Sequence, residues 1–584
     1  RLREQDRRPD EWGFWTNRSM NWNSNCAACH MTGYAKNYDV ATDSYDSKWN
    51  EMGISCTQCH SGMDGHAEAF AAPPYPELPT LDDDQIMHNC ASCHSRRGEL
   101  VGGFQPGDNY HDHYRLALPS QRGLYYADGQ IRDEVFVYGS FMMSKMGGRA
   151  GVSCLDCHNP HSGELILPAD NNALCMSCHN QGNQHDAPVI EPVAHSFHDA
   201  DSSGNRCVEC HMTHTNYMER DPRRDHGFTS PDPLLTRELG IPNACNKCHD
   251  DQSVDWAVEW VDKWYGGKME RPERQRTRLI ARAYDGEPGL GPELAAAAGE
   301  AEIDAWRATL LGLAANYAGD PDVTAASIEA LADESPLVRV AAMQGLSGHP
   351  DAASLTAGLR DDPVRTVRLD AIWIARDTLQ LGGDDYDELM SFLEFNADQP
   401  TGAARFGQME FAQGNFERAE GWYEKAISWD MHSMPLYHDL AMMRNARGDP
   451  EGATAILEQA LEVNPAEPQS HFMLGLLEAE HGDQASALAQ LEAAVEDDPG
   501  FYRAWYNLSL LHASGERLGL ALEAIRRAET LDPGNPEAPY VRATLHLRLE
   551  EYDAAREAAA KALELNPNYT PAARILRRLS APQR

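Results

Sequence analysis

The stretch Cys207-Val-Glu-Cys210-His211 is one of seven copies of the pattern Cys-x-x-Cys-His, and all of them lie before residue 250. Together they use all fourteen cysteines of the chain. Two thiols three positions apart can form thioethers to the two vinyl groups of one haem, and the adjacent histidine then reaches the iron. The sequence therefore predicts seven covalently attached c-type haems. The thioether cysteines and proximal histidines are Cys26, Cys29 and His30; Cys56, Cys59 and His60; Cys90, Cys93 and His94; Cys154, Cys157 and His158; Cys175, Cys178 and His179; Cys207, Cys210 and His211; and Cys245, Cys248 and His249.

Other roles for these cysteines explain less of the pattern. Cys-x-x-Cys units can hold zinc, but the units would then combine in twos, and seven is odd. Redox dithiols or structural disulfides would not require a histidine directly after every second cysteine. Haem attachment accounts for both the spacing and the histidine.

Histidines outside the motifs are candidates for the second axial position of each iron. An electron-transfer haem usually takes a second ligand there, and histidine is the common choice in multihaem proteins. Methionines 20, 31 and 212 are weaker candidates, because histidine is not in short supply. Ten histidines of the first 250 residues qualify: His66, His88, His111, His113, His161, His185, His195, His198, His214 and His226.

Five segments around the motifs share one resemblance: His195-Ser-Phe-His198, Asp221-Pro-Arg-Arg-Asp-His226, Pro242-Asn-Ala-Cys245, Cys154-Leu-Asp-Cys-His158-Asn-Pro-His161 and Asp112-His113-Tyr114-Arg115. They resemble exported multihaem cytochromes c that carry C-terminal tetratricopeptide repeats. The haem packing of that group is similar to that of the tetrahaem cytochrome of the hydroxylamine oxidation pathway. The resemblance extends over the whole chain. It implies His66, His113, His161, His195, His198 and His226 as distal ligands, with His88, His111, His185 and His214 competing for the seventh place.

A repeat of 34 residues covers positions 400–571. Small residues and prolines recur at this step, and glycines mark the turn between the paired helices. This is the tetratricopeptide period, in which small residues let two helices approach closely. We expect five repeats and a capping helix from Arg574 to Leu579. The recurring residues are Ala419, Ala453, Ala487, Ala521 and Ala555; Ala426, Ala460, Ala494, Ala528 and Ala562; Pro465, Pro499, Pro533 and Pro567; and Gly414, Gly448 and Gly482.

The segment between the motifs and the repeats has helical periodicity. Trp256, Trp260 and Trp264 recur every four residues, which predicts one face of a helix packed on a neighbouring helix or on the haem region. Segments 333–339 and 361–365 each place a proline and a valine before an Ala/Leu-rich helix, a pattern typical of HEAT repeats. In the long interval before Cys154, Val135-Phe136-Val137-Tyr138 favours a β-strand.

These patterns predict a mainly α protein in three parts. Residues 1–250 form a loop-rich heptahaem domain, in which about 36 residues per haem cannot build an ordinary side-chain core. Residues 251–399 form a HEAT-like helical region, and residues 400–584 form the repeat solenoid with its capping helix. Solenoids of this kind present a surface to a partner. The scattered histidines of the solenoid are therefore expected to have structural or groove-lining roles.

The charge balance limits the partners. Lys and Arg total 50 against 90 Asp and Glu, a formal net charge of -40. Nucleic acid and anionic membranes need clustered cations, so neither is an expected partner. A basic protein or a high-salt habitat agrees better with this charge.

No apolar run approaches the roughly 20 residues of a membrane span. Because haem is attached outside the cytoplasm, we expect an exported protein, periplasmic or at the cell surface, whose leader was removed.

Electron transfer is the leading functional hypothesis. Two histidines on each iron would leave no room for a substrate, so closely packed haems would form a conduit. The repeats would dock a redox partner or another copy, and a basic start (Arg1, Arg3, Arg7 and Arg8) could pair with an acidic tail in a filament.

The alternative is an oxidoreductase acting on a small nitrogen or sulfur oxyanion. It would use Arg96 and Arg97, or Arg223 and Arg224, beside an open haem. Neutralising haem propionates is the simpler role for these arginines. The variant motif Cys-x-x-Cys-Lys, used by one group of nitrite reductases, does not occur in the sequence.

Overall fold

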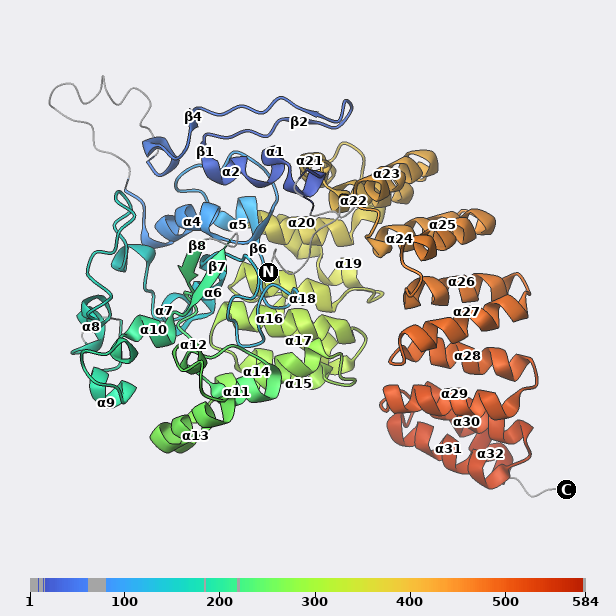
Figure 1. Cartoon of the computed structure of the whole chain (residues 1–584). Coiled ribbons are helices and arrows are strands. Elements are labelled where there is room, and N and C mark those ends of the chain that lie inside the picture. Colours follow the sequence, from blue (N-terminus) through green and yellow to red (C-terminus); the bar gives the residue numbers. More distant parts are fainter. Residues whose placement is uncertain are drawn as a thin grey trace. The chain divides into compact units, whose positions relative to one another are not determined.

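The computed structural model describes residues 9, 14, 16–60, 80–182, 185–217 and 221–580. The chain forms two compact units, which are described separately. The first is built from Met20–Asp398, and the second from Gln399 onward together with residues 8–19. Figure 1 shows the elements of both.

The motif-bearing part of the first unit consists of short helices, loops and two-stranded ladders. Its longest described helix, α4, has 12 residues and begins with a capping box between Asp82 and Gln85. The turn η1 (Arg18–Met20) precedes this part, and its helices and 3₁₀ turns are α1 (Trp22–Asn25), α2 (Ala27–His30), η2 (Cys56–Gln58), α4 (Asp83–His94), α5 (Tyr110–His113), α6 (Tyr138–Met143), α7 (Lys145–Gly148), η3 (Cys154–Asp156), α8 (Ala173–His179), α9 (Pro192–Ser196), η4 (Ser203–Asn205), α10 (Cys207–His211), α11 (Pro233–Leu239) and α12 (Cys245–Cys248).

Four antiparallel ladders connect these helices. They are β1 (Met31–Thr32) with β4 (Glu51–Met52), β2 (Tyr38–Asp39) with β3 (Ser44–Tyr45), β5 (Arg97–Glu99) with β6 (Tyr114–Leu116), and β7 (His214–Tyr217) with β8 (Asp221–Arg224). The strand expected at residues 135–138 is wrong. Phe136 makes only an isolated bridge to Ser95, and α6 begins at Tyr138. Val135 and Tyr138 are both buried in the core, so packing decides the backbone here rather than strand propensity.

Longer helices follow residue 250. They are α13 (Val254–Tyr265), η5 (Gly266–Met269), α14 (Pro272–Tyr284), α15 (Gly291–Glu300), α16 (Asp304–Ala314), η6 (Ala315–Tyr317), α17 (Pro321–Ala330), α18 (Pro336–Gly345), α19 (Ala352–Leu355), η7 (Ala357–Asp361), α20 (Arg365–Ile374), η8 (Arg376–Thr378) and α21 (Asp384–Asn396). Five of them start with proline in the first turn or with a side-chain N-cap, which satisfies the free N–H groups of that turn. The HEAT-like assignment and the division into three domains stay predictions.

One hydrophobic core runs across residue 250. It joins residues of the motif region, such as Tyr110 and Tyr125, to α14, α15, α16 and α18. The indole of Trp306 in α16 donates a hydrogen bond of 2.8 Å to the carbonyl of Met143 at the end of α6. Gly129, which has φ +90°, lies against the same indole, and a Cβ there would come within 3.0 Å of it. The change of sequence pattern at residue 250 therefore lies within one packed unit.

Buried ion pairs join distant segments of the first unit, and they include those of Arg274 with Asp232 and of Lys36 with Asp398. Arg274 donates two hydrogen bonds of 2.9 Å to Asp232, and both side chains are nearly inaccessible. Lys36 Nζ lies 3.1 Å from Asp398 Oδ1, with side-chain exposures of 6% and 0%. Tyr45 also donates to Asp398, at 3.1 Å. These contacts hold distant segments together, and removing one partner would leave a buried charge uncompensated.

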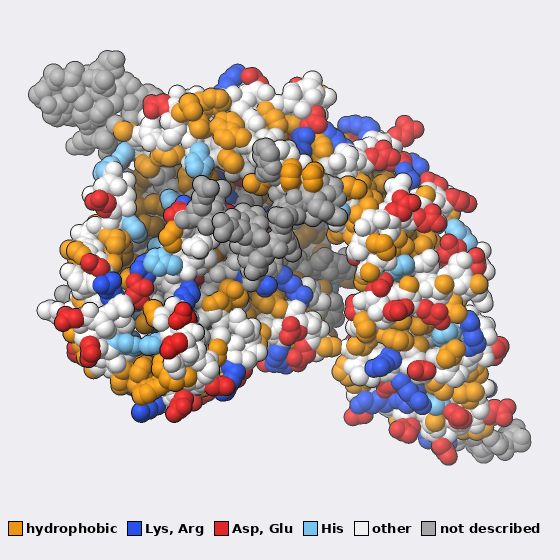
Figure 2. Space-filling model, in the orientation of Figure 1, with side chains coloured by type: hydrophobic (Ala, Val, Ile, Leu, Met, Phe, Trp, Pro, Cys, Tyr) orange, Lys and Arg blue, Asp and Glu red, His pale blue; other side chains and the backbone are white. Residues whose placement is uncertain are grey.

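The second unit is a series of antiparallel helix pairs. Its helices are α22 (Pro400–Ala412), α23 (Phe416–Trp429), α24 (Met434–Ala446), α25 (Pro450–Val463), α26 (Pro468–Glu480), α27 (Gln484–Asp497), α28 (Tyr502–Ser514), α29 (Leu518–Leu531), α30 (Glu537–Arg548), α31 (Tyr552–Leu565) and α32 (Thr570–Ser580). The expected capping helix lies within α32. Asp and Glu side chains are spread over the visible face of this unit (Figure 2).

The repeat positions explain how the helices pack. The alanines at 419, 453, 487, 521 and 555 are all 0% exposed, because each lies where two helices meet. Gly414, Gly448 and Gly482 occupy the turn within a pair, with φ between +78° and +85°. In the last two pairs the same position holds Glu516 and Glu550, at φ +58° and +62°. Along the described part of the chain, helices lack the length and apolar character needed to cross a bilayer.

Candidate haem sites

Each Cys-x-x-Cys-His motif folds as one tight helical turn. The backbone N–H of the histidine donates to the carbonyl of the first cysteine, as in His60 to Cys56 at 2.8 Å and His249 to Cys245 at 2.9 Å. Such a turn places the residue at i+3 beside the residue at i. All fourteen thiols are free of disulfides, and all of them are partly or fully exposed in the protein. The thiols are therefore accessible for thioether formation.

Four motif histidines each face a histidine from elsewhere in the sequence. The pairs, with ring-centroid distances, are His60 and His161 at 6.0 Å, His158 and His226 at 6.3 Å, His195 and His211 at 6.0 Å, and His198 and His249 at 6.3 Å. Two imidazoles on one metal should have centroids about 6 Å apart, because each metal–nitrogen bond is about 2 Å and each ring centre lies about 1 Å further. The four pairs therefore fit the two axial positions of a haem iron.

Backbone carbonyls fix several of these rings. The Nδ1 atoms of His211, His226 and His198 lie 3.1, 2.9 and 2.6 Å from the carbonyls of Thr229, Arg224 and Ser196. A carbonyl can only accept, so each Nδ1 carries the proton and Nε2 keeps a lone pair. Burial also lowers the pKa of His211 and of His226, which favours the neutral imidazole that a metal requires.

The remaining distal candidates have other neighbours. His113 Nε2 lies 3.2 Å from Asp108, and His185 Nδ1 lies 3.0 Å from the Ala150 carbonyl. His214 is exposed at the start of β7. His66 lies outside the described residues. Among the residues that the structure describes, no histidine ring faces His30, His94 or His179 at the centroid distance of the four pairs.

His88 and His111 form a fifth pair that contains no motif residue. Their centroids are 6.1 Å apart and their planes are almost perpendicular, at 82°. Burial lowers the pKa of His111 to about 3 and also lowers the pKa of His88. Sequence reasoning treated these two as competitors for one iron and did not foresee that they face each other.

Cysteines of successive motifs lie beside one another. Cysteines of motifs one and three, three and four, and five and six are in contact, and cysteines of motifs two and three, four and five, and six and seven lie near enough to interact electrostatically. The neighbouring cysteines are Cys29 and Cys93, Cys59 and Cys90, Cys90 and Cys154, Cys157 and Cys178, Cys175 and Cys207, and Cys210 and Cys245. The Cys29 thiol, for example, is 3.9 Å from the Cys93 carbonyl. Groups attached at these cysteines would form a continuous series.

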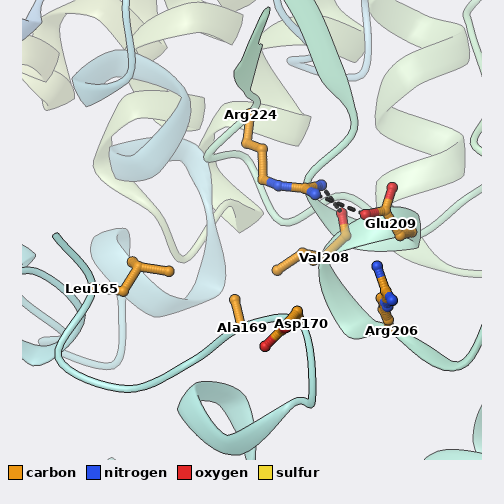
Figure 3. Close-up of a pocket in the computed structure, with 7 residues that line it drawn as sticks. All are labelled: Leu165, Ala169, Asp170, Arg206, Val208, Glu209 and Arg224. Atoms are coloured by element: carbon orange, nitrogen blue, oxygen red, sulfur yellow. Dashed lines mark hydrogen bonds and ion pairs between the residues drawn. The ribbon is translucent and has the colours of Figure 1, made fainter. Parts of the chain in front are cut away.

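A cavity of about 300 Å³ opens beside motif six (Figure 3). Leu165 and Ala169 contribute apolar surface, and Arg224 reaches toward Glu209 from the opposite side, at 2.7 Å. An apolar wall with guanidinium groups suits the edge of a macrocycle that carries carboxylates. The lining residues are Leu165, Ala169, Asp170, Arg206, Val208, Glu209 and Arg224.

The tryptophans of α13 lie along the pair of His249, from the seventh motif, and His198. Trp256 lies 4.9 Å from the ring of His249, and Trp264 lies 5.9 Å from that of His198. Trp260 packs between them along the helix. All three are half-buried, whereas Ala257, Val258 and Val261 on the same helix are buried. The tryptophan face therefore packs on the haem region.

All four arginines considered for an open haem have local partners, and Arg97 lies 3.4 Å from Glu99. Arg96 is exposed, with Nη1 3.5 Å from the Glu134 carbonyl. Arg223 pairs with Asp221, and Arg224 pairs with Glu209. The fourth, Arg97, is buried against Cys29.

Known proteins match both halves of the chain. The family model for cytochrome c554 and c-prime matches residues 5–61, and that for the doubled CXXCH motif matches residues 148–184. Tetratricopeptide repeat models match residues 444–500, 480–536 and 537–569. No curated protein matches the chain.

Solved structures of repeat proteins are also similar. The tetratricopeptide protein YrrB is 22% identical over 32% of this chain and 95% of its own, with a TM-score of 0.27. PilF of Pseudomonas aeruginosa is 21% identical over 31% and 82%, with a TM-score of 0.28. MamA of Desulfovibrio magneticus RS-1 is 21% identical over 29% and 96%, with a TM-score of 0.26.

The family matches identify covalently bound haem c as the cofactor and haem-based electron transfer as the activity that such domains provide. The repeat matches add a region of the kind that commonly mediates protein–protein contacts. The chain combines cytochrome c554 and doubled CXXCH regions with C-terminal tetratricopeptide repeats, the arrangement of a multihaem cytochrome c with a repeat domain.

Proposed function

We propose that the chain is a heptahaem electron conduit whose haems are mostly held by two histidines each. The observation that carries this proposal is the set of four histidine pairs at 6.0–6.3 Å, each containing one motif histidine. Haem c, when bound, supplies a one-electron couple at each motif. The paired histidines close both axial positions, so the chain's own residues leave no site for a substrate at these irons.

The proximity of motif cysteines supports a continuous path. Motifs one and two lie near motif three, and the series ends at motif seven. The protein's task is then to fix the spacing and orientation of the redox groups. The carbonyls that hold the Nδ1 atoms of His198, His211 and His226 keep these axial rings from rotating.

The distal ligands proposed from the geometry are His161 for motif two, His226 for motif four, His195 for motif six and His198 for motif seven. His66, His113, His88, His111, His185 and His214 remain the candidates for motifs one, three and five.

Covalent attachment through the cysteines takes place outside the cytoplasm, so the protein is proposed to work in the periplasm or at the cell surface.

The repeat unit is proposed to dock a redox partner or another copy of the chain. Its five helix pairs offer the extended surface on which such solenoids bind proteins. End-to-end docking of copies would form a cytochrome filament. Light scattering across protein and salt concentration tests this part, since particles that stay monomeric throughout would rule out the filament.

Haem stoichiometry tests the conduit directly. Pyridine haemochrome absorbance against protein mass should give seven haems per chain, and proteolytic peptides should carry haem at each Cys-x-x-Cys-His. A value of five or fewer would contradict the heptahaem assignment.

A further inference from the structure

Arg97 lies where the first and third motifs meet. Both of its terminal nitrogens are 3.6 Å from Cys29 Sγ, and Cys29 is itself 3.9 Å from the Cys93 carbonyl. Only 7% of the Arg97 side chain is exposed. Its guanidinium carbon lies 4.3 Å from the centre of the Tyr114 ring. A permanent positive charge is thus held within the protein, next to a cysteine of one motif and close to a cysteine of another.

This position differs from that of an arginine that neutralises propionates. In haem c the thioether carbons lie on one edge of the macrocycle, and the propionates lie on the opposite edge. Arg97 lies 3.6 Å from the sulfur that would form the thioether, so it would lie at the thioether edge of the first haem. That haem's own carboxylates, on the opposite edge, would then not offset the charge.

We propose that Arg97 raises the reduction potential at the junction of motifs one and three. The inference rests on the proposed function, because it requires haem at Cys29 and Cys93. An oxidised haem carries one more positive charge than a reduced haem, so a nearby guanidinium disfavours oxidation. At an effective dielectric constant near 20, unit charges about 10 Å apart change an equilibrium roughly tenfold.

Other charges near Arg97 oppose or moderate this effect. Glu99 Oε1 lies 3.4 Å from Arg97 Nη2 and is the nearest carboxylate. The buried pair of Lys36 and Asp398 also acts on Glu99 and is internally balanced. Tyr114, packed against the guanidinium, is kept neutral because burial raises its pKa. The net field at Cys29 is positive because Arg97 touches the sulfur and Glu99 does not.

A potentiometric titration of the full-length haem-loaded protein, followed by visible absorbance, tests the proposal. In R97M we expect one or two of the seven one-electron steps to move to lower potential. The oxidised-to-reduced ratio at a fixed potential should change about tenfold, which is about 59 mV for one electron. R97K keeps the charge and should titrate close to the natural protein. R556M, at an exposed arginine of the repeat unit that pairs with Asp553, should superimpose on it.

An R97M titration that superimposes on the natural protein, or that moves to higher potential, overturns the proposal. If R97M does not incorporate all of its haem, R97Q provides the second arm, because it keeps a polar side chain without the charge. R97Q should also move a step to lower potential, and no change or a higher potential counts against Arg97. Mass spectrometry of the natural protein distinguishes a failure of the proposed function from a failure of the role proposed for Arg97. Haem-free peptides at Cys29 and Cys93 would defeat the proposed function itself, whereas attached haems with unchanged potentials would defeat only the role of Arg97.

Discussion

His195 and His211 face each other with ring centroids 6.0 Å apart and planes 18° apart. His211 is fixed through Nδ1 to the Thr229 carbonyl at 3.1 Å, and the hydroxyl of Tyr265 donates to the carbonyl of His195. The two rings come from α9 and α10, and the residues are 16 apart in sequence. This geometry makes a specific prediction, that His195 is the distal ligand of the iron at motif six.

Replacing His195 by alanine should open one iron. We expect H195A to retain its haem, since the thioethers remain, and to convert one haem from low spin to high spin. Electron paramagnetic resonance of the oxidised protein measures this change. H481A removes an exposed histidine of the repeat unit that is not a ligand candidate, and it serves as the control. A spectrum for H195A identical to that of H481A would refute the assignment.

Breaking the buried pair of Lys36 and Asp398 should destabilise the first unit strongly. In D398N the Lys36 ammonium stays buried without its counter-charge, at a cost of about 3–5 kcal/mol. The matched control is D46N, because Asp46 and Lys48 form a surface pair with exposures of 79% and 70%. Surface pairs contribute about 0–1 kcal/mol. Denaturant unfolding of the haem-loaded protein measures the loss of unfolding free energy in D398N and in D46N. Equal losses would show that Asp398 does not form a buried ion pair with Lys36.

Glycine at position 550 should stabilise the repeat unit. Glu550 adopts φ +62° where three earlier repeats use glycine, and a side chain in this left-handed conformation costs roughly 1–2 kcal/mol. E550G should therefore raise the unfolding free energy of this unit by about 1 kcal/mol. The extra conformational entropy that glycine loses on folding reduces this gain. E550A keeps a Cβ and should not reproduce the gain. Thermal unfolding compares the two, and a stability for E550G at or below that of E550A would contradict the strain.

Asp128 should make stability depend on pH. Burial raises the pKa of its carboxyl to about 6, although Gln130 donates to it at 2.7 Å and 3.1 Å. A folded pKa above the unfolded value means that the carboxyl's contribution is fully present below about pH 4 and is lost as the pH rises through 6. D128N should therefore gain stability relative to the natural protein as the pH rises from 5 to 7, by about 1 kcal/mol.

Melting temperatures of the loaded protein at pH 5, 6 and 7 measure this difference. D133N replaces an exposed aspartate a few residues away and provides the control. A difference between D128N and the natural protein that stays constant from pH 5 to 7 would show that Asp128 does not titrate in this range.

The sequence predicts those features that depend on local spacing. The 34-residue step located the alanines between the repeat helices, and their complete burial follows from that spacing. The turn of Cys-x-x-Cys-His is equally local. Glu516 and Glu550 were not recognised as turn residues, because the position is marked by glycine only in the first three repeats.

Long-range packing could not be predicted in the same way. His161 faces His60 from about a hundred residues away, and one sequence contains no signal for that partnership. Tyr138 was expected in a strand, but burial beside Tyr110 places it in a helix. The contact of Trp306 with Met143 likewise shows that helices after residue 250 complete the core of the motif region. The change of composition at residue 250 had suggested that the two regions were separate.

Near-infrared magnetic circular dichroism of the fully oxidised protein reports the axial ligand pair of each low-spin ferric haem and so tests the bis-histidine ligation itself. We expect a bis-histidine intensity equivalent to most of seven haems per chain, with at least the four irons of motifs two, four, six and seven included. An intensity equivalent to fewer than four bis-histidine haems, or a spectrum dominated by high-spin iron, would contradict it.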